Sequence, residues 1–142
     1  MKLKGLWVAV FFFSFFTSNF SRAEILDLSI LHTNDLHSKY RPIPGFVELG
    51  GIARLATAIK TARASSENSL LIDGGDFSEG QIYYFLGLGR TSMEMMNALG
   101  YDAAVVGNHD WLNGPDQLLE ISKGLSEKTT LVGQNVDVSK YA

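Results

Sequence analysis

The feature that most constrains the fold is a regular alternation of short apolar runs and amphipathic stretches from Ile25 onward. The short runs predict strands, and the amphipathic stretches predict helices because their apolar residues recur every three or four positions. Strand and helix alternate in this way when crossover helices join parallel strands. The sequence therefore predicts an α/β fold with a parallel sheet, whose expected strands cover residues 25–33, 68–73, 101–107 and 129–138.

The segments between these strands are also predictable in outline. The clearest helix is expected over residues 52–64, where apolar residues follow helical spacing. A broken helical region follows the turn at 74–80, and Gly100 is its expected C-cap. Another helix should begin near Pro115, since proline suits the first turn of a helix. Residues 34–50 are rich in proline and glycine and are expected to form a long loop.

Three polar clusters follow the first three predicted strands, at the points where those strands end. Parallel sheets with crossover connections carry their reactive loops beyond the carboxyl ends of the strands, so these clusters should meet in space. Two of the three histidines of the chain belong to them. The clusters are residues 33–37 (TNDLH), 73–76 (DGGD) and 108–110 (NHD).

The first two clusters carry side chains that suit a metal ion. Asp35 and His37 leave one loop two residues apart, and a carboxylate with a neutral imidazole suits zinc, iron or manganese. Asp76 follows Gly75, and glycine lets the backbone approach a ligand closely and adopt positive φ. Each cluster alone also fits a simpler reading, a surface turn for the first and a capped turn for the second.

The third cluster combines an amide, an imidazole and a carboxylate. Asn108 offers a neutral carbonyl oxygen as a metal ligand, while His109 can act as an acid or stabilise charge. Asp110 could orient that imidazole or only fix the loop, and the cluster alone could also be a helix entry. His32 is interpreted as a supporting or packing residue, and Asp73 as a support for its loop.

Taken together, the blocks LHTNDLH, GGDFSEG and GNHD resemble the first three signature blocks of the calcineurin-like metallophosphoesterase superfamily. The stretch GGIARLATAI is similar to its 5′-nucleotidase branch, whose secreted members hydrolyse nucleotides and nucleotide sugars. The resemblance covers residues 24–142, which would form one N-terminal part of such a domain. It implies half of a four-layer α/β/β/α sandwich.

The resemblance also implies two divalent metal ions, such as zinc, manganese or iron. Asp35 and His37 would bind the first ion, Asp76 would bridge both, and Asn108 would bind the second. His109 would stabilise the transition state and protonate the leaving alcohol, and with Asn108 it would contact the substrate. The expected substrate is a phosphate ester of a nucleotide or a related compound.

Two departures from the family pattern set further expectations. The third block of the nucleotidase branch usually ends in an aspartate that pairs with the histidine, but this position is Leu112 here, and whether the neighbouring Asp110 replaces it is open. The family also carries downstream histidine ligands, whereas no histidine follows His109. The chain is therefore expected to be a truncated and incomplete catalyst; alternatively it is a non-catalytic remnant or half of a two-chain enzyme.

Residues 1–23 have the layout of a secretory signal peptide. Lys2 and Lys4 precede an apolar run over 5–16, and small residues favour cleavage after Ala23. A membrane-spanning helix would need about 20 apolar residues, and polar residues end this run too early. We therefore expect an exported protein without a stable membrane anchor, located in the periplasm or outside the cell.

The charge balance restricts the partners. The chain has 12 Lys and Arg against 15 Asp and Glu, a formal net charge of −3, and removal of residues 1–23 would take away only basic groups. An acidic surface argues against a nucleic-acid duplex or an anionic membrane as partner. The absence of cysteine excludes a disulfide.

Overall fold

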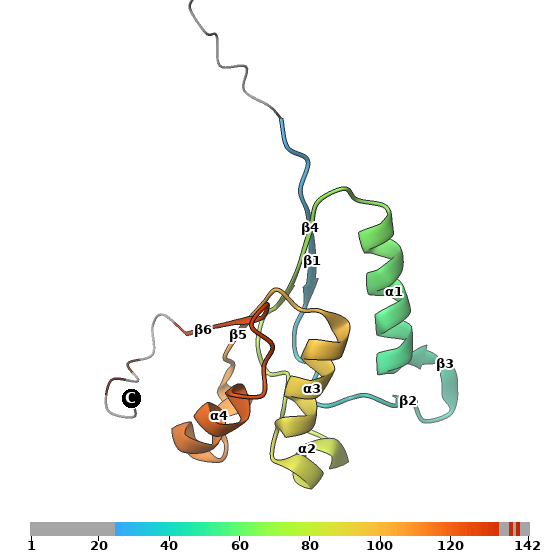
Figure 1. Ribbon diagram of the computed structural model, residues 1–142. Coiled ribbons are helices and arrows are strands. Elements are labelled where there is room, and N and C mark those ends of the chain that lie inside the picture. The colour runs from blue at the N-terminus through green and yellow to red at the C-terminus, as the bar shows by residue number, and fades with distance from the viewer. Residues whose placement is uncertain (1–24, 134–136, 138, 140–142) are drawn as a thin grey trace, which may run out of the picture.

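The computed structural model describes residues 25–133, 137 and 139, so the predicted signal peptide at 1–23 lies outside the described residues. The chain forms a mixed α/β fold with a four-stranded parallel sheet, which confirms the predicted fold class in its main feature (Figure 1). The strands follow the order β1-β4-β5-β6 across this sheet. They are β1 (Ser29–Thr33), β4 (Ser69–Asp73), β5 (Ala103–Val105) and β6 (Thr130–Val132).

Helices connect these strands, as the alternation in the sequence predicts. In Figure 1, α1 lies beside β1 and β4, while α2, α3 and α4 lie in the lower half of the view. None of the helices in the described part of the chain has the length and apolar character that crossing a membrane requires. They are α1 (Ile52–Ala64), α2 (Ile82–Gly87), α3 (Arg90–Leu99), the short 3₁₀ helix η1 (Asn108–Trp111) and α4 (Gly114–Ser122).

The expectation of a long loop over residues 34–50 was wrong in its second half. A small antiparallel sheet forms there from β2 (Pro42–Ile43) and β3 (Phe46–Gly50). Gly45 has a φ of 81° between the two strands, so the chain reverses direction at a residue that tolerates this conformation. The Pro-Gly pair before β3 is a turn signal, which makes a hairpin reasonable despite the proline content.

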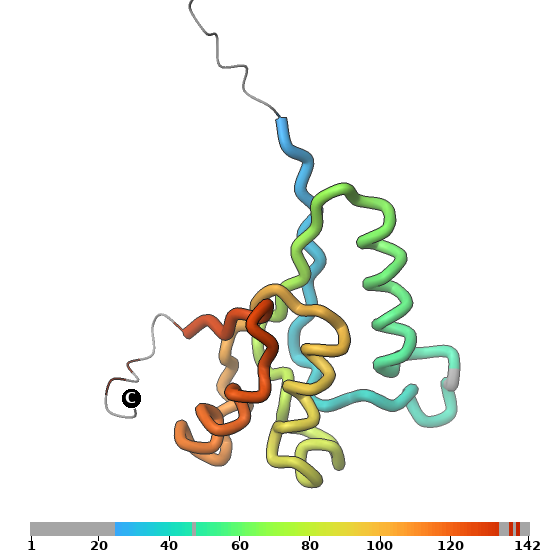
Figure 2. Tube along the Cα trace, in the orientation of Figure 1, coloured from blue at the N-terminus to red at the C-terminus, as the bar shows by residue number. Residues whose placement is uncertain are grey.

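The main core lies on one face of the parallel sheet. Leu71 of β4 is fully buried, with 0% exposure, and it packs with side chains from α1, α3 and α4. This arrangement fixes the helices against the strands and so fixes the loops that join them (Figure 2). The core residues are Ile59, Leu71, Phe77, Met93, Met96, Tyr101, Ala104, Leu118 and Ile121.

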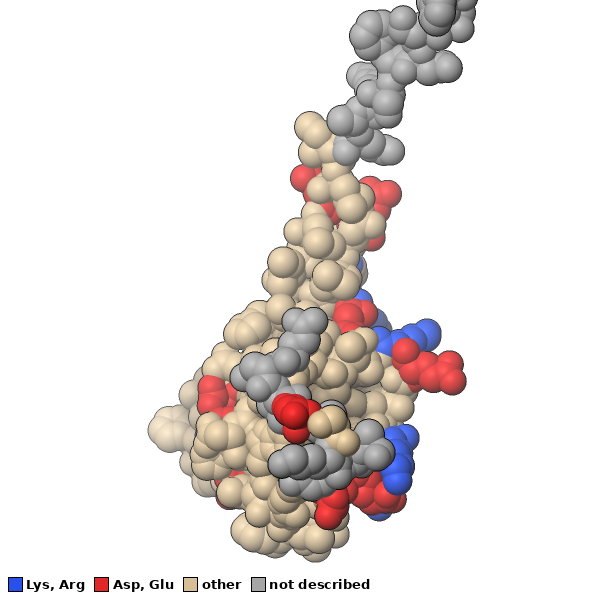
Figure 3. Space-filling view, turned by 90° about the vertical axis from the view of Figure 1, so that its left-hand side faces the viewer, with Lys and Arg blue, Asp and Glu red and all other residues tan. Residues whose placement is uncertain are grey.

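The opposite face of the sheet carries exposed apolar side chains. Neighbouring residues in a strand point to opposite faces, and the residues next to the buried positions are exposed. The view from the side of β6 shows mostly uncharged residues, with acidic groups scattered among them and basic groups along the right-hand edge (Figure 3). The exposed residues are Ile30 at 61%, Leu70 at 41%, Val105 at 45% and Val132 at 37%.

Candidate metal centre

The loops that follow β1 and β4 run side by side, because the pairing of the strands continues beyond their ends. Thr33 and Asp73 are the last pair of the strand register. Beyond them, the N–H of Asp35 donates to the carbonyl oxygen of Gly75 at 3.0 Å, and the N–H of His37 donates to that of Asp76 at 2.9 Å. These bonds hold the two predicted ligand loops together at one edge of the sheet.

Three of the four predicted metal ligands have a left-handed backbone. The φ angles are 54° at Asp35, 47° at His37 and 56° at Asp76. This region disfavours residues with a Cβ by roughly 1–2 kcal/mol each, although aspartate and histidine tolerate it better than most. Such conformations persist where the surrounding structure fixes them, and they are frequent at functional sites. Here the bonds between the two loops supply that constraint.

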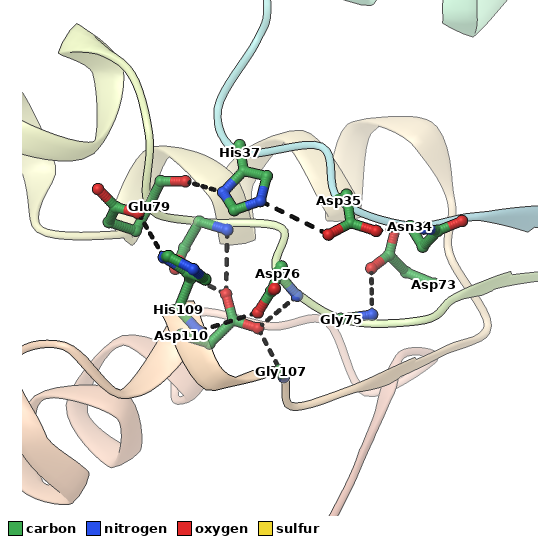
Figure 4. Close-up of polar contacts among 11 residues, drawn as sticks. Asn34, Asp35, His37, Asp73, Gly75, Asp76, Glu79, Gly107, His109 and Asp110 are labelled. Atoms are coloured by element: carbon green, nitrogen blue, oxygen red, sulfur yellow. Dashed lines mark hydrogen bonds and ion pairs between the residues drawn. The ribbon is translucent and has the colours of Figure 1, made fainter.

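The side chains of these three residues converge. Each of Asp35, His37 and Asp76 offers a ligand atom within 4.8 Å of the others. His37 Nε2 lies 3.6 Å from Asp35 Oδ1, and His37 Nδ1 lies 2.6 Å from the carbonyl oxygen of Glu79 (Figure 4). Since a carbonyl can only accept, Nδ1 carries the proton and Nε2 keeps its lone pair for a metal. Two carboxylates and one such imidazole suit a divalent metal ion.

The third loop reaches this centre through the backbone of η1. The N–H of His109 donates to Oδ1 of Asp76 at 2.9 Å, which directs that carboxylate toward the third cluster. Gly107 makes the approach possible, because a Cβ at this position would overlap Asp76. Asn108 is exposed at the start of η1, next to His109 in the chain. The structure therefore brings the three predicted clusters together.

Asp110 fixes these loops, which is the second of the two roles that the sequence leaves open. The residue is only 6% exposed, and its carboxylate accepts four hydrogen bonds. The N–H groups of Asp76 and Gly107 donate to Oδ2, both at 2.9 Å. The N–H of Ser78 at 3.0 Å and its hydroxyl at 2.7 Å donate to Oδ1. Burial raises the pKa of Asp110, and the hydrogen bonds from Ser78, Gly107 and Asp76 oppose that rise.

The imidazole of His109 pairs with Glu79, a residue that our sequence analysis missed. His109 Nδ1 lies 2.7 Å from Glu79 Oε2, with the two side chains 40% and 23% exposed. The ring of His37 lies edge-on to that of His109, with centroids 4.9 Å apart. The sequence did contain a hint of this pairing: Glu79 lies three residues after Asp76, and the usual partner of the histidine is replaced by Leu112.

Two further polar residues of the clusters have supporting positions. Asp73 is 2% exposed and accepts hydrogen bonds from the N–H of Gly75 at 2.9 Å and from the hydroxyl of Thr33. It supports its loop, as predicted. Burial raises the pKa of Asp73, although these hydrogen bonds act in the opposite direction. His32 is exposed on β1, with Nε2 beside Gly74.

Comparison with known proteins identifies the family that this chain resembles in sequence. A family model described as calcineurin-like phosphoesterase matches residues 28–140. A snake venom 5′-nucleotidase of Naja atra is 42% identical over 101 residues, which cover 66% of this chain and 19% of that protein. The trifunctional nucleotide phosphoesterase protein YfkN of Bacillus subtilis is 32% identical over 126 residues, or 80% of this chain and 8% of that protein.

A solved structure shows the same arrangement of elements. The 5′-nucleotidase precursor from Thermus thermophilus matches with a TM-score of 0.70 and 33% identity, over 79% of this chain and 23% of that chain. The present chain thus spans about a fifth of the length of the 5′-nucleotidases it matches, 19% for the protein of Naja atra.

Proposed function

The chain belongs to the calcineurin-like phosphoesterase family, which includes metal-dependent 5′-nucleotidases, and from this we propose that it carries part of the active site of a nucleotide phosphoesterase. The observation that carries the proposal is the convergence of Asp35, His37 and Asp76 within 4.8 Å. The names of its relatives, 5′-nucleotidases and a nucleotide phosphoesterase, support a nucleotide ester as substrate.

The donor set fits the two divalent ions that the resemblance implies. Asp35 and His37 would hold one ion, Asp76 would be shared, and the amide oxygen of Asn108 would contribute to the other. When bound, such ions activate a water molecule for in-line attack and neutralise the charge that develops on the phosphoryl oxygens. The protein contributes by holding Asp76 through the N–H of His109 and holding His37 through Glu79.

The imidazole of His109 is the proposed acid. Its Nδ1 faces Glu79, which leaves Nε2 for the substrate. As the bond between phosphorus and the leaving oxygen breaks, that oxygen takes the bonding electron pair. The ring of His109, protonated on both nitrogens, gives it the proton of Nε2 and keeps that of Nδ1, so the alcohol leaves uncharged and the ring becomes neutral. Asn108 and His109 would both contact the phosphate group. Asp110 acts on this chemistry only by fixing the loops that carry these residues.

The location of the protein forms part of the same proposal. The layout of residues 1–23 supports export, and we propose that the protein acts in the periplasm or outside the cell. The formal net charge of −3 supports a small-molecule substrate over a nucleic-acid duplex.

The proposal is tested on the protein at whatever length its gene encodes, with 5′-AMP as substrate and Mn²⁺ or Zn²⁺ added. We expect hydrolysis that a chelator abolishes and that Asp76→Asn lowers by more than about 100-fold, because the substitution removes the shared carboxylate charge. Asp116→Asn is the matched control, since Asp116 lies in the first turn of α4, away from the three clusters. Full activity of Asp76→Asn, or hydrolysis that needs no metal, would contradict the proposal.

A further inference from the structure

We propose that Glu79 positions His109, in place of the carboxylate that is absent at Leu112. The inference rests on the proposed function for its catalytic meaning, but the contact itself is a feature of the fold. His109 Nδ1 lies 2.7 Å from Glu79 Oε2. Glu79 comes from the loop after β4, whereas Leu112 directly follows η1, the element that carries His109.

The other carboxylates of the centre are engaged elsewhere. Both oxygens of Asp110 accept hydrogen bonds from Asp76, Gly107 and Ser78. Oδ1 of Asp76 accepts from the backbone of His109 and not from its ring. Among the carboxylates at these strand ends, Glu79 is thus the one that meets the imidazole (Figure 4).

The contact determines which ring nitrogen faces the substrate. A carboxylate accepts a hydrogen bond, so the neutral ring of His109 carries its proton on Nδ1. Nε2 is then the nitrogen that faces the reacting atoms: it holds the donated proton in the doubly protonated ring and is left without it in the neutral ring, while Nδ1 keeps its proton toward Glu79 and rotation of the ring is restricted. Imidazole groups in other hydrolytic sites are oriented by a carboxylate in the same manner.

The main chain at Glu79 is itself held by contacts with His37, which limits the positions that the Glu79 side chain can take. Its carbonyl oxygen accepts from Nδ1 of His37 at 2.6 Å. The next residue, Gly80, has a φ of 141°, and a Cβ there would lie 2.7 Å from Cβ of His37. One residue therefore orients both histidines of the centre, His37 through its main chain and His109 through its side chain.

The first test measures the tautomer of His109 in the full chain without metal. Long-range ¹H–¹⁵N correlation spectra of histidine-labelled protein separate the Nδ1–H form from the Nε2–H form, and His32→Gln and His37→Gln variants assign the signals. We expect the neutral ring of His109 to be mainly Nδ1–H in the wild type and mainly Nε2–H in Glu79→Ala. An unchanged tautomer would overturn the proposal, whether or not the protein proves to be a phosphoesterase.

The second test compares two esters in the metal-loaded full-length protein. 5′-AMP needs a proton on its leaving alkoxide, whereas 4-nitrophenyl phosphate releases a weakly basic phenolate. We expect Glu79→Gln to lower kcat for 5′-AMP by about 100-fold, the lower end of what a positioned acid contributes, and for the nitrophenyl ester by less than about 5-fold. KM should stay within about 2-fold. Equal losses for the two esters would contradict a positioning role.

A rescue variant and a control complete this test. Residues three apart in a 3₁₀ helix lie above one another, so an aspartate in place of Leu112 would face His109. Leu112 is 56% exposed, and a carboxylate there stays hydrated. In the Glu79→Gln protein, we expect the additional substitution Leu112→Asp to raise kcat for 5′-AMP by at least about 10-fold. Glu120→Gln, which removes only the exposed pair with Lys123, should leave both rates unchanged.

The alternative role for Glu79 is that of a metal ligand, since its carboxylate, His37 and His109 also lie within 4.8 Å of one another. Titration calorimetry with Mn²⁺ separates the two roles. A positioning residue predicts that Glu79→Gln binds Mn²⁺ within about 3-fold of the wild type. A loss of 10-fold or more would identify Glu79 as a ligand and overturn the proposal.

Discussion

At the scale of single residues, the centre depends on carboxylates that are buried and yet hydrogen-bonded. Asp73 and Asp110 are 2% and 6% exposed, and each accepts bonds from loop backbone. Burial disfavours the charged form, and the hydrogen bonds offset only part of that free energy, so the pKa of each group is raised. These residues hold the loops, but their buried carboxylates lower the stability of the fold once they are ionised.

Asp73→Asn should reveal this loss of stability as a function of pH. The folded-state pKa of Asp73 is raised, so between its ordinary value near 4 and the raised value the unfolded chain has released a proton that the folded chain retains. Stability therefore falls as pH rises through this window. Asparagine does not titrate. We expect the wild type to lose free energy of unfolding relative to the variant as the pH rises from about 4 through the raised pKa of Asp73, as measured by urea denaturation. A constant difference would contradict this.

The sequence was sufficient to propose the metal ligands but not the partner of the acid. Asp35, His37 and Asp76 stand in short blocks after strands, and the rule that parallel strands end at one edge predicts their convergence. Glu79 and His109 are 30 positions apart in the chain, on different loops. Their pairing depends on the separation and rotation of those loops, which sequence spacing does not specify.

At the scale of elements, the site depends on how closely η1 approaches the loop after β4. The backbone of Gly107 lies against Asp76. The carboxylate of Asp110 accepts hydrogen bonds from the N–H groups of both residues and so ties the two loops together. Because Gly107 has an ordinary φ of −86°, its requirement is for space and not for an unusual conformation. The two predicted ligand loops can thus approach this closely because residue 107 is a glycine and has no Cβ.

Gly107→Ala should separate these loops. The added Cβ would overlap Asp76, so we expect a loss of about 1–3 kcal/mol in the free energy of unfolding and at least about 10-fold weaker Mn²⁺ binding. Gly87→Ala is the control, since a Cβ there meets the flexible hydroxyl of Thr91 at 3.2 Å. Urea denaturation and titration calorimetry measure the two effects. Equal behaviour of the two variants would argue against a steric role of Gly107.

Predictions of elements succeeded where periodicity was strong. The helix over residues 52–64 has the observed bounds of α1, and Gly100 ends α3 in a left-handed conformation. Two strands were overestimated in length: β1 is Ser29–Thr33 within the expected 25–33, and β5 is Ala103–Val105 within the expected 101–107. Strand length is decided by which residues find a partner across the sheet, and the register is a property of the tertiary structure.

At the scale of the whole molecule, the sheet has one packed and one exposed face. The packed face meets α1, α3 and α4 through the core that includes Leu71. The exposed face carries apolar side chains that follow the same strands, such as Leu70. The stability of the described part of the chain should therefore depend on one face only.

Adjacent leucines of β4 test this asymmetry. Leu71→Ala removes a side chain with 0% exposure and should lower the free energy of unfolding by about 2–5 kcal/mol. Leu70→Ala removes the same atoms from a residue that is 41% exposed, and its effect should be below about 1 kcal/mol. Urea denaturation of both variants gives the comparison. Equal losses would mean that both faces are packed in solution.

The two ways in which Glu79 contacts the histidines differ in their response to mutation. The acceptor for His37 is a main-chain oxygen, which every amino acid possesses, whereas the acceptor for His109 is a side-chain carboxylate. Substitution at this position can therefore change the environment of the proposed acid while the proposed metal ligand keeps its hydrogen bond. A single codon thus specifies both contacts, yet only the contact with the proposed proton donor depends on which amino acid that codon encodes.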